Sequence, residues 1–197
     1  MRRALVSTGI LAAAALLIWL VFRAGGMDER LAAVFYDPAT RGFPLRNDWL
    51  FAVLGHTAVK WGALALWVIC VALGGPWRRG AWYMVPIIVV VETLKSVSPY
   101  SCPWDLPAYG GMKADAGRCL PAAHPLIGFA LFGLYLALRE AGRSAARPVL
   151  AAAWLMGLAA GAIQLARGAH FASHVLWTAW IASAITLLLA AVVRLRA

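Results

Sequence analysis

The sequence has 197 residues and a formal net charge of +10, and 63% of its residues are hydrophobic. A soluble domain of this length would be roughly half apolar, so the composition indicates an integral membrane protein. The positive charge does not indicate nucleic-acid binding, because many of the arginines collect in short segments at the ends of the apolar runs.

Taken in chain order, the apolar runs predict six transmembrane helices, because a hydrocarbon core of about 30 Å needs about 20 apolar residues. The runs occupy residues 4–22, 57–73, 81–95, 121–138, 148–166 and 173–193. The first run follows Met-Arg-Arg and resembles a signal peptide, but it is long for one and no clear cleavage site follows, so we expect it to be retained. The prediction is a single all-α domain over residues 1–197, a polytopic membrane protein whose outer-face loops cover the site.

The arginine positions predict the orientation in the membrane. They fall in the N-terminus, the second and fourth connections and the C-terminus, which share one side if six helices alternate. They are Arg2, Arg3, Arg78, Arg79, Arg139, Arg143, Arg147, Arg194 and Arg196. The positive-inside rule makes that side cytoplasmic. In the first outer connection, residues 28–36 (DERLAAVFY) could form an interfacial amphipathic helix before a turn at Asp37-Pro38.

Two of the three cysteines lie together in the second outer connection. Cys70 lies in the middle of a predicted helix, where we expect an inert packing residue. Cys102 and Cys119 could pair in an oxidising compartment, or they could remain two free thiols.

Polar side chains gather at one membrane face, because the ends of odd-numbered helices and the starts of even-numbered ones meet there. The residues are Lys95, His124, Gln164, Arg167, His170 and His174. Ionisable residues at membrane depth cost about 2.5–3.5 kcal/mol each on insertion scales and usually face a cavity or a partner. Each has an ordinary explanation when taken alone: a long basic side chain can snorkel, a histidine can pack, and two histidines at i and i+4 can bind a metal. Taken together, they predict an anion site.

The residue types favour phosphate chemistry at this site. Lysine and arginine hold phosphate oxygens, and histidine can act as a nucleophile or as a general acid–base near neutral pH. The sequence contains no glycine-rich P-loop and no carboxylate cluster suited to magnesium. A metal-free and cofactor-free phosphoryl transfer through a phosphohistidine fits this inventory.

Three segments of the chain resemble the three-part signature of the type 2 phosphatidic acid phosphatase family of membrane enzymes. The segment KSVSPYSCP (95–103) has the spacing of K-x-x-x-x-x-x-R-P, with cysteine for arginine. The segment PAAH (121–124) corresponds to P-S-G-H. The segment IQLARGAHFASH (163–174) corresponds to S-R-x-x-x-x-x-H-x-x-x-D, with glutamine for arginine and histidine for aspartate. The resemblance covers most of the chain from residue 85 onward and suggests a divergent bacterial branch.

The resemblance implies roles for the matching residues. His170 would attack phosphorus, His124 would protonate the leaving oxygen, and Lys95 would hold phosphate oxygens. Gln164 takes the place of a phosphate-binding arginine, and His174 takes the place of the aspartate that orients the nucleophile. Since a neutral histidine brings no negative charge, we expect a slower or more pH-sensitive enzyme.

Charge alone suggests further phosphate ligands that the family motif does not supply. Arg167 lies three residues after Gln164, roughly one helical turn on, and could supply the missing guanidinium. Arg118 and Lys113, in the outer connection, could close over the phosphate. The expected substrate is a lipid phosphate or diphosphate, such as undecaprenyl diphosphate, phosphatidylglycerol phosphate, phosphatidate or a lipid A phosphate. The expected location is the bacterial inner membrane, with both termini cytoplasmic and the site facing the periplasm.

Four other functions compete with a phosphatase. The same residues could transfer the phosphoryl group to another lipid. The substituted motif residues suggest a protein that kept the fold and binds lipid phosphates without turnover. A transporter would also need ionisable residues in the membrane, but they would run through the midplane rather than cluster at one face. A zinc site on His170 and His174 lacks a convincing third ligand.

Overall fold

The computed structural model describes residues 2–113 and 116–196, and over these residues the chain is helical without a β-strand. Backbone pairing outside helices is limited there to one isolated bridge between Asp37 and Gly42. The predicted all-α class is therefore confirmed. The side chains of Arg2, Arg3 and Arg196, used above to predict orientation, lie outside the described part.

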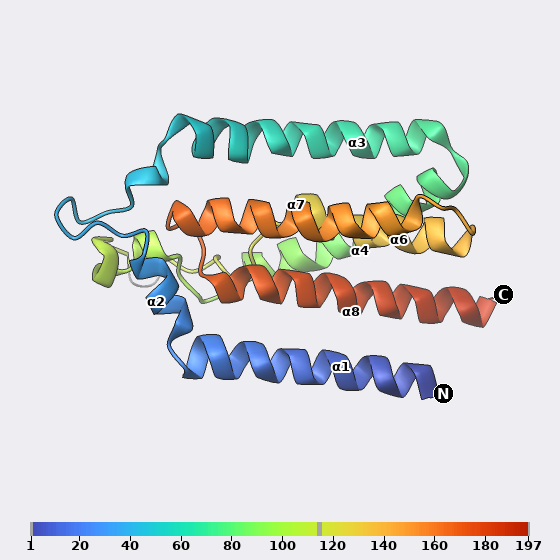
Figure 1. Cartoon of the computed structure of the whole chain (residues 1–197), viewed down its shortest axis with the longest axis horizontal. Helices are drawn as coiled ribbons and strands as arrows, with labels where there is room; N and C mark the ends of the chain where they lie inside the picture. The colour runs from blue at the N-terminus through green and yellow to red at the C-terminus, as the bar shows by residue number, and fades with distance from the viewer. Residues whose placement is uncertain (1, 114–115, 197) are drawn as a thin grey trace.

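The helices follow one another with short connections at one end of the bundle and long ones at the other. Their bounds are α1 (Arg2–Ile18) continued by the π-helix η1 (Trp19–Ala24), α2 (Met27–Ala33), η2 (Pro44–Arg46), the π-helix η3 (Leu50–Ala58) continued by α3 (Val59–Leu73), α4 (Gly75–Ser96), η4 (Pro103–Asp105), η5 (Pro107–Tyr109), α5 (Leu126–Phe129), α6 (Leu131–Glu140), α7 (Ala146–Ala166) and α8 (Ala172–Arg196). Figure 1 shows both termini at one end and the two long connections at the other.

Three helices of the described chain are long and apolar enough to cross a membrane. They span Leu5–Ala24, Ala146–Ala166 and Ala172–Arg194, and α3 is a shorter apolar helix. No residue in the most apolar window of the first is buried, as expected of a helix that faces lipid along much of its surface. These helices indicate a membrane protein.

Three predicted helix starts differ from the structure by several residues. The second helix begins as the π-helix η3 at Leu50 rather than at residue 57. The third helix begins at Gly75 rather than near residue 81, because Gly74 takes a positive φ of 72° and a proline in the first turn starts the helix. The Arg78 side chain then donates to the Val71 carbonyl at 3.0 Å and caps the end of α3. The fourth helix begins at Leu126 rather than Pro121, because residues 119–125 follow an irregular path tied to α8.

The helices around the site approach closely through glycines. A Cβ at Gly133 of α6 would lie 2.6 Å from the Tyr83 backbone carbon of α4. A Cβ at Gly128 of α5 would clash with the α7 backbone at Gly157, and a Cβ at Gly157 would clash with the Phe129 ring. Small residues let helix backbones approach without a side chain between them, as expected in membrane bundles. The packing fixes the helix ends that carry the polar residues.

Candidate active site

The turn between α7 and α8 presents His170. Gly168 adopts a φ of 71°, its N–H donates to the Leu165 carbonyl at 2.9 Å, and the Ala169 N–H donates to the Gln164 carbonyl at 2.9 Å. This is the double hydrogen bond of a Schellman motif, which ends a helix on a left-handed glycine. The sequence ARGAH therefore stops α7 at Ala166 and leaves His170 in the link before α8.

The segment that carries His124 is fastened to the first turns of α8. The Ala122 N–H donates to the His174 carbonyl at 3.2 Å. The Thr178 hydroxyl lies within hydrogen-bond distance of the carbonyl oxygens of Ala122 (2.7 Å) and His174 (2.9 Å). These contacts hold the segment before α5 against the start of α8, and with it the half-buried His124.

Three of the expected basic residues surround His170. Its side chain is 7% exposed, and burial lowers its pKa well below the usual 6.5. Repulsion by His174, Lys95 and His124 lowers the pKa further, in that order. Such repulsion acts only between groups that lie near one another, so the structure brings together residues from four separate helix ends. At neutral pH, His170 is an uncharged base.

The disulfide between Cys102 and Cys119 forms one wall of the site. The Cα atoms of the two cysteines are 5.3 Å apart, and the buried Cys119 Sγ lies 3.2 Å from Nδ1 of His170. A disulfide sulfur carries no hydrogen, so Nδ1 is the only possible donor in this contact. The contact favours the tautomer with hydrogen on Nδ1, which leaves a lone pair on Nε2.

His174 is close to His170 but makes no hydrogen bond with it in the described chain. The two rings are 5.9 Å apart between centroids and meet edge to face, and within residues 2–113 and 116–196 Nδ1 of the buried His174 has no hydrogen-bond partner. The neighbour of His170 Nδ1 is the disulfide sulfur, and this geometry does not supply the hydrogen bond expected between the two rings.

A cavity of about 310 Å³ opens beside His174 and contains an arginine that sequence reasoning missed. Its walls are formed by Ile18, Trp19, Arg23, Tyr100, Leu120, Ser173, His174 and Trp177. The Arg23 guanidinium lies 5.1 Å from the centre of the Tyr100 ring, in cation–π geometry. The sequence does indicate this location, because Arg23 directly follows the first apolar run (4–22) and so lies on the same membrane face as the other basic residues.

The remaining predicted phosphate ligands lie less centrally. Arg167 donates through Nη1 to Gln164 Oε1 at 3.2 Å and through Nε to the Arg46 carbonyl at 3.0 Å. Partial burial, followed by repulsion from Arg46, lowers the pKa of Arg167. Gln164 is 2% exposed, and its Nε2 has no hydrogen-bond partner among the residues that the structure describes. Arg118 and Lys113 are exposed on the outer connection, and no hydrogen bond of the described chain ties either side chain to His170.

A buried carboxylate supports the start of α8. Asp28 of α2 is 4% exposed and accepts a hydrogen bond from the Ser173 N–H at 2.9 Å and a second, short one from the Ser173 hydroxyl. A carboxylate at a helix N-terminus is also favoured by the helix dipole. Burial raises the pKa of Asp28, and the two hydrogen bonds from Ser173 oppose that shift. The short α2 overlaps most of the predicted segment 28–36 and is followed by the turn at Asp37. No local pattern could show that Asp28 reaches Ser173.

The disulfide limits which side chains at the site could bind a metal. Side-chain atoms of Cys102, Cys119 and His170 lie within 4.8 Å of one another, which is the spacing of a metal site in the described residues. Cysteine binds a metal as a thiolate, and here the two sulfurs are bonded to each other, so neither is a thiolate. His174 does not belong to this group, so the site differs from the zinc pair considered from the sequence.

Comparisons of the chain with protein-family models, with curated proteins and with solved structures give no match. The fold and the site define a helical membrane protein with a buried, basic histidine cluster at one end of its bundle.

Proposed function

We propose that the protein is a metal-independent lipid phosphate phosphatase of the inner membrane. The observation that carries this proposal is the buried His170, uncharged, with Nδ1 against a disulfide sulfur and with Lys95 and His124 around it. A neutral imidazole with a free Nε2 lone pair is a nucleophile, and nearby cations attract a phosphate group. The resemblance of the three motifs supports the same assignment.

The proposed membrane arrangement has six spans, formed by α1–η1, η3–α3, α4, α5–α6, α7 and α8. Both termini then lie on one side, in agreement with their common end in Figure 1. The positive-inside rule puts that side in the cytoplasm, so His170 faces the periplasm. An oxidising periplasm favours the Cys102–Cys119 pair.

The proposed reaction has two steps. In the first, Nε2 of His170 attacks phosphorus, the bond between phosphorus and the lipid oxygen breaks, and His124 in its imidazolium form gives its proton to that oxygen. In the second, the now neutral His124 takes a proton from water, the water oxygen attacks phosphorus, and the phosphorus–nitrogen bond breaks to release phosphate. Lys95 holds the phosphate oxygens in both steps, and Arg23 is an additional cation beside the cavity at His174.

An apolar groove gives the lipid tail a place beside the site. A cavity of about 410 Å³ lies between α3, α4 and α5, and its walls include Leu66, Ile88, Leu126 and Ala123. Ala123 precedes His124, so a chain in this groove would end near the leaving oxygen. This arrangement suits a substrate with a long hydrocarbon chain and a terminal phosphate or diphosphate.

Lipid-phosphate binding without turnover is the second candidate. The observation that favours it is the loss of both signature arginines and of the aspartate at Cys102, Gln164 and His174. Transfer of the phosphoryl group to another lipid, rather than to water, would use the same first step.

The test offers purified protein a panel of lipid phosphates and diphosphates in the presence of a chelator. Phosphate release that is lost in His170→Ala and kept in Met112→Ala, at an exposed residue of the connection between α4 and α5, supports the phosphatase. Binding of these lipids without release by the wild type would instead identify the second candidate. Turnover unchanged in His170→Ala would refute the proposed nucleophile.

A further inference from the structure

The largest cavity described here lies away from the histidine cluster, between α1, α6 and α8, and measures about 840 Å³. Its walls are formed by Val6, Ser7, Thr8, Leu11, Arg139, Ala184, Leu187, Leu188, Ala190, Ala191 and Arg194. Arg139 is in the last turn of α6 and Arg194 is near the end of α8, so the cavity opens towards the end of the bundle that holds both termini (Figure 1).

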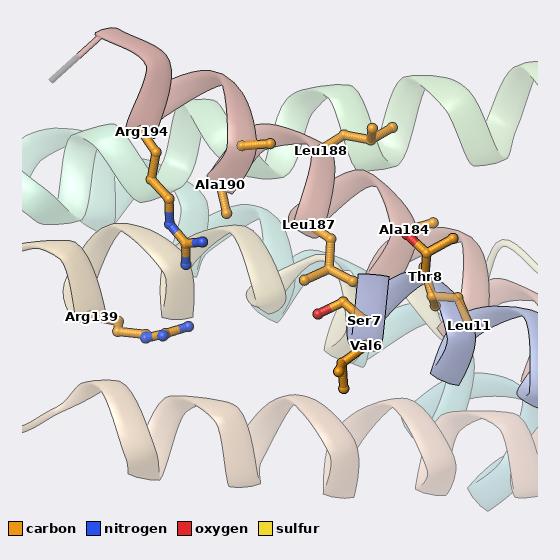
Figure 2. Close-up of a pocket in the computed structure, with 11 residues that line it drawn as sticks. Val6, Ser7, Thr8, Leu11, Arg139, Ala184, Leu187, Leu188, Ala190 and Arg194 are labelled. Atoms are coloured by element: carbon orange, nitrogen blue, oxygen red, sulfur yellow. The ribbon is translucent and has the colours of Figure 1, made fainter. Parts of the chain in front are cut away.

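The cavity joins a cationic end to an apolar wall. Figure 2 shows the side chains of Arg139 and Arg194 directed into the same space, with Leu187 and Val6 further along it. None of its lining residues is acidic, and neither guanidinium has a carboxylate partner in the described chain. Glu140, next to Arg139 in sequence, instead accepts a hydrogen bond from the Tyr83 hydroxyl at 3.5 Å.

Two guanidinium groups that line one cavity without a carboxylate partner favour binding of an anion. A shared anion offsets the repulsion between them and accepts hydrogen bonds from their N–H groups. Both arginine side chains are exposed and lie at the cationic end of the cavity, where the headgroup of a bound lipid would meet water. Below the arginines, the wall is built from leucine, valine and alanine, and it faces the lipid side because Leu188 and Val6 are 66% and 55% exposed. Figure 2 shows that Ser7 and Thr8 of α1 add hydroxyl groups beyond Leu187, beside Val6 and Leu11.

We propose that this cavity binds a diacyl phospholipid with an anionic headgroup, of the phosphatidylglycerol class. The phosphate lies between Arg139 and Arg194, the headgroup or glycerol oxygens lie at Ser7 and Thr8, and the acyl chains follow the apolar groove between α1 and α8. The lipid joins α1, the least buried of the three long apolar helices, to the rest of the bundle. A direct bond between α1 and α8 runs from Trp180 Nε1 to the Leu11 carbonyl at 2.8 Å. This site does not depend on the proposed phosphatase function.

The experiment is native mass spectrometry of the purified chain with added dioleoyl phosphatidylglycerol or dioleoyl phosphatidylcholine, which differ only in the headgroup. The wild type should bind phosphatidylglycerol more tightly. An arginine near an anionic lipid surface contributes about 1 kcal/mol, or about 5-fold in affinity, so Arg139→Gln with Arg194→Gln should weaken phosphatidylglycerol binding by about 30-fold. The matched control is Arg143→Gln with Arg147→Gln, which removes the same charge from the same end of the bundle without touching the cavity.

Ala191→Trp keeps both arginines and places a bulky side chain in the cavity, so it should also reduce phosphatidylglycerol binding. This variant decides the question if the double arginine variant does not fold. Equal binding of the two lipids by the wild type would overturn the proposal, and so would an equal loss in the control pair or unchanged binding in Ala191→Trp.

Discussion

The buried Asp28 offers a test of how the first outer connection supports the site. We consider Asp28→Asn, which removes the charge but keeps an oxygen that can accept a hydrogen bond. The raised pKa of Asp28 means that the folded protein holds the proton more tightly than the unfolded chain does, mainly because of burial. Relative to Asp28→Asn, the wild type should therefore gain stability as the pH falls through the native pKa of Asp28 towards the unfolded value of 3.8.

The hydrogen bonds from Ser173 set the size of the effect. A hydrogen bond to a charged group contributes about 1.5–3 kcal/mol, and Asp28→Ala removes the acceptor of two such bonds. The variant also avoids the cost of burying a carboxylate, so the free energy of unfolding should fall by about 3 kcal/mol. In a double-mutant cycle, Asp28→Ala and Ser173→Ala should couple by about 1.5 kcal/mol or more, because they share the hydroxyl bond. The assay is unfolding by sodium dodecyl sulfate titration in mixed micelles at several pH values.

Asp37→Asn is the matched control with the opposite sign. Hydrogen bonds from Thr40 and Ala39 lower the pKa of Asp37, so its contribution to stability is present above 3.8 and is lost as the pH falls through the native pKa. The wild type should thus lose its advantage over Asp37→Asn in acid. A pH dependence of the same sign for both variants, or a Ser173 coupling near zero, would refute the reasoning about Asp28.

Three further predictions concern the site itself. The disulfide between Cys102 and Cys119 closes a loop with a sequence separation of 17, so replacing both cysteines by serine should lower the free energy of unfolding by about 3 kcal/mol, measured by thermal unfolding. The same variant should turn over more slowly at saturating substrate, because His170 Nδ1 loses the sulfur beside it. Full activity would show that the sulfur does not hold the tautomer of His170. His174→Asp should retain or raise activity, because a carboxylate would stabilise the charged form of His170, and complete loss in a folded protein would count against this. The acid limb of the pH–activity profile that belongs to His170 should lie well below pH 6.5, since its lowered pKa keeps it neutral there; a midpoint above 6.5 would contradict that assignment.

Local patterns in the sequence predicted the elements whose ends are set locally. The end of α7 at Ala166 agrees with the prediction, because an arginine and a glycine in sequence encode the Schellman turn. The grouping of Lys95, His124, His170 and His174 followed from counting helix directions, which needs only the number of apolar runs.

Contacts between distant segments could not be predicted in this way. Asp28 meets Ser173 across 145 residues, and the contact of Cys119 with His170 depends on how the second connection folds over the turn. The start of α4 was missed because Trp77, Arg78 and Arg79 read as a charged loop, whereas the arginine that caps α3 belongs to a helix. The position of Arg23 after the first apolar run already placed it on the same membrane face, but its place beside His174 follows only from the cavity that both residues line.

The most direct measurement of the central claim is the search for a phosphorylated histidine. Purified protein is mixed with a lipid phosphate that it turns over, quenched in alkali, digested and mapped by mass spectrometry. The account predicts a phosphoryl group on His170 in the wild type and none in His170→Ala. A phosphoryl group on another residue, or turnover without any trapped intermediate while His170→Ala remains active, would contradict it.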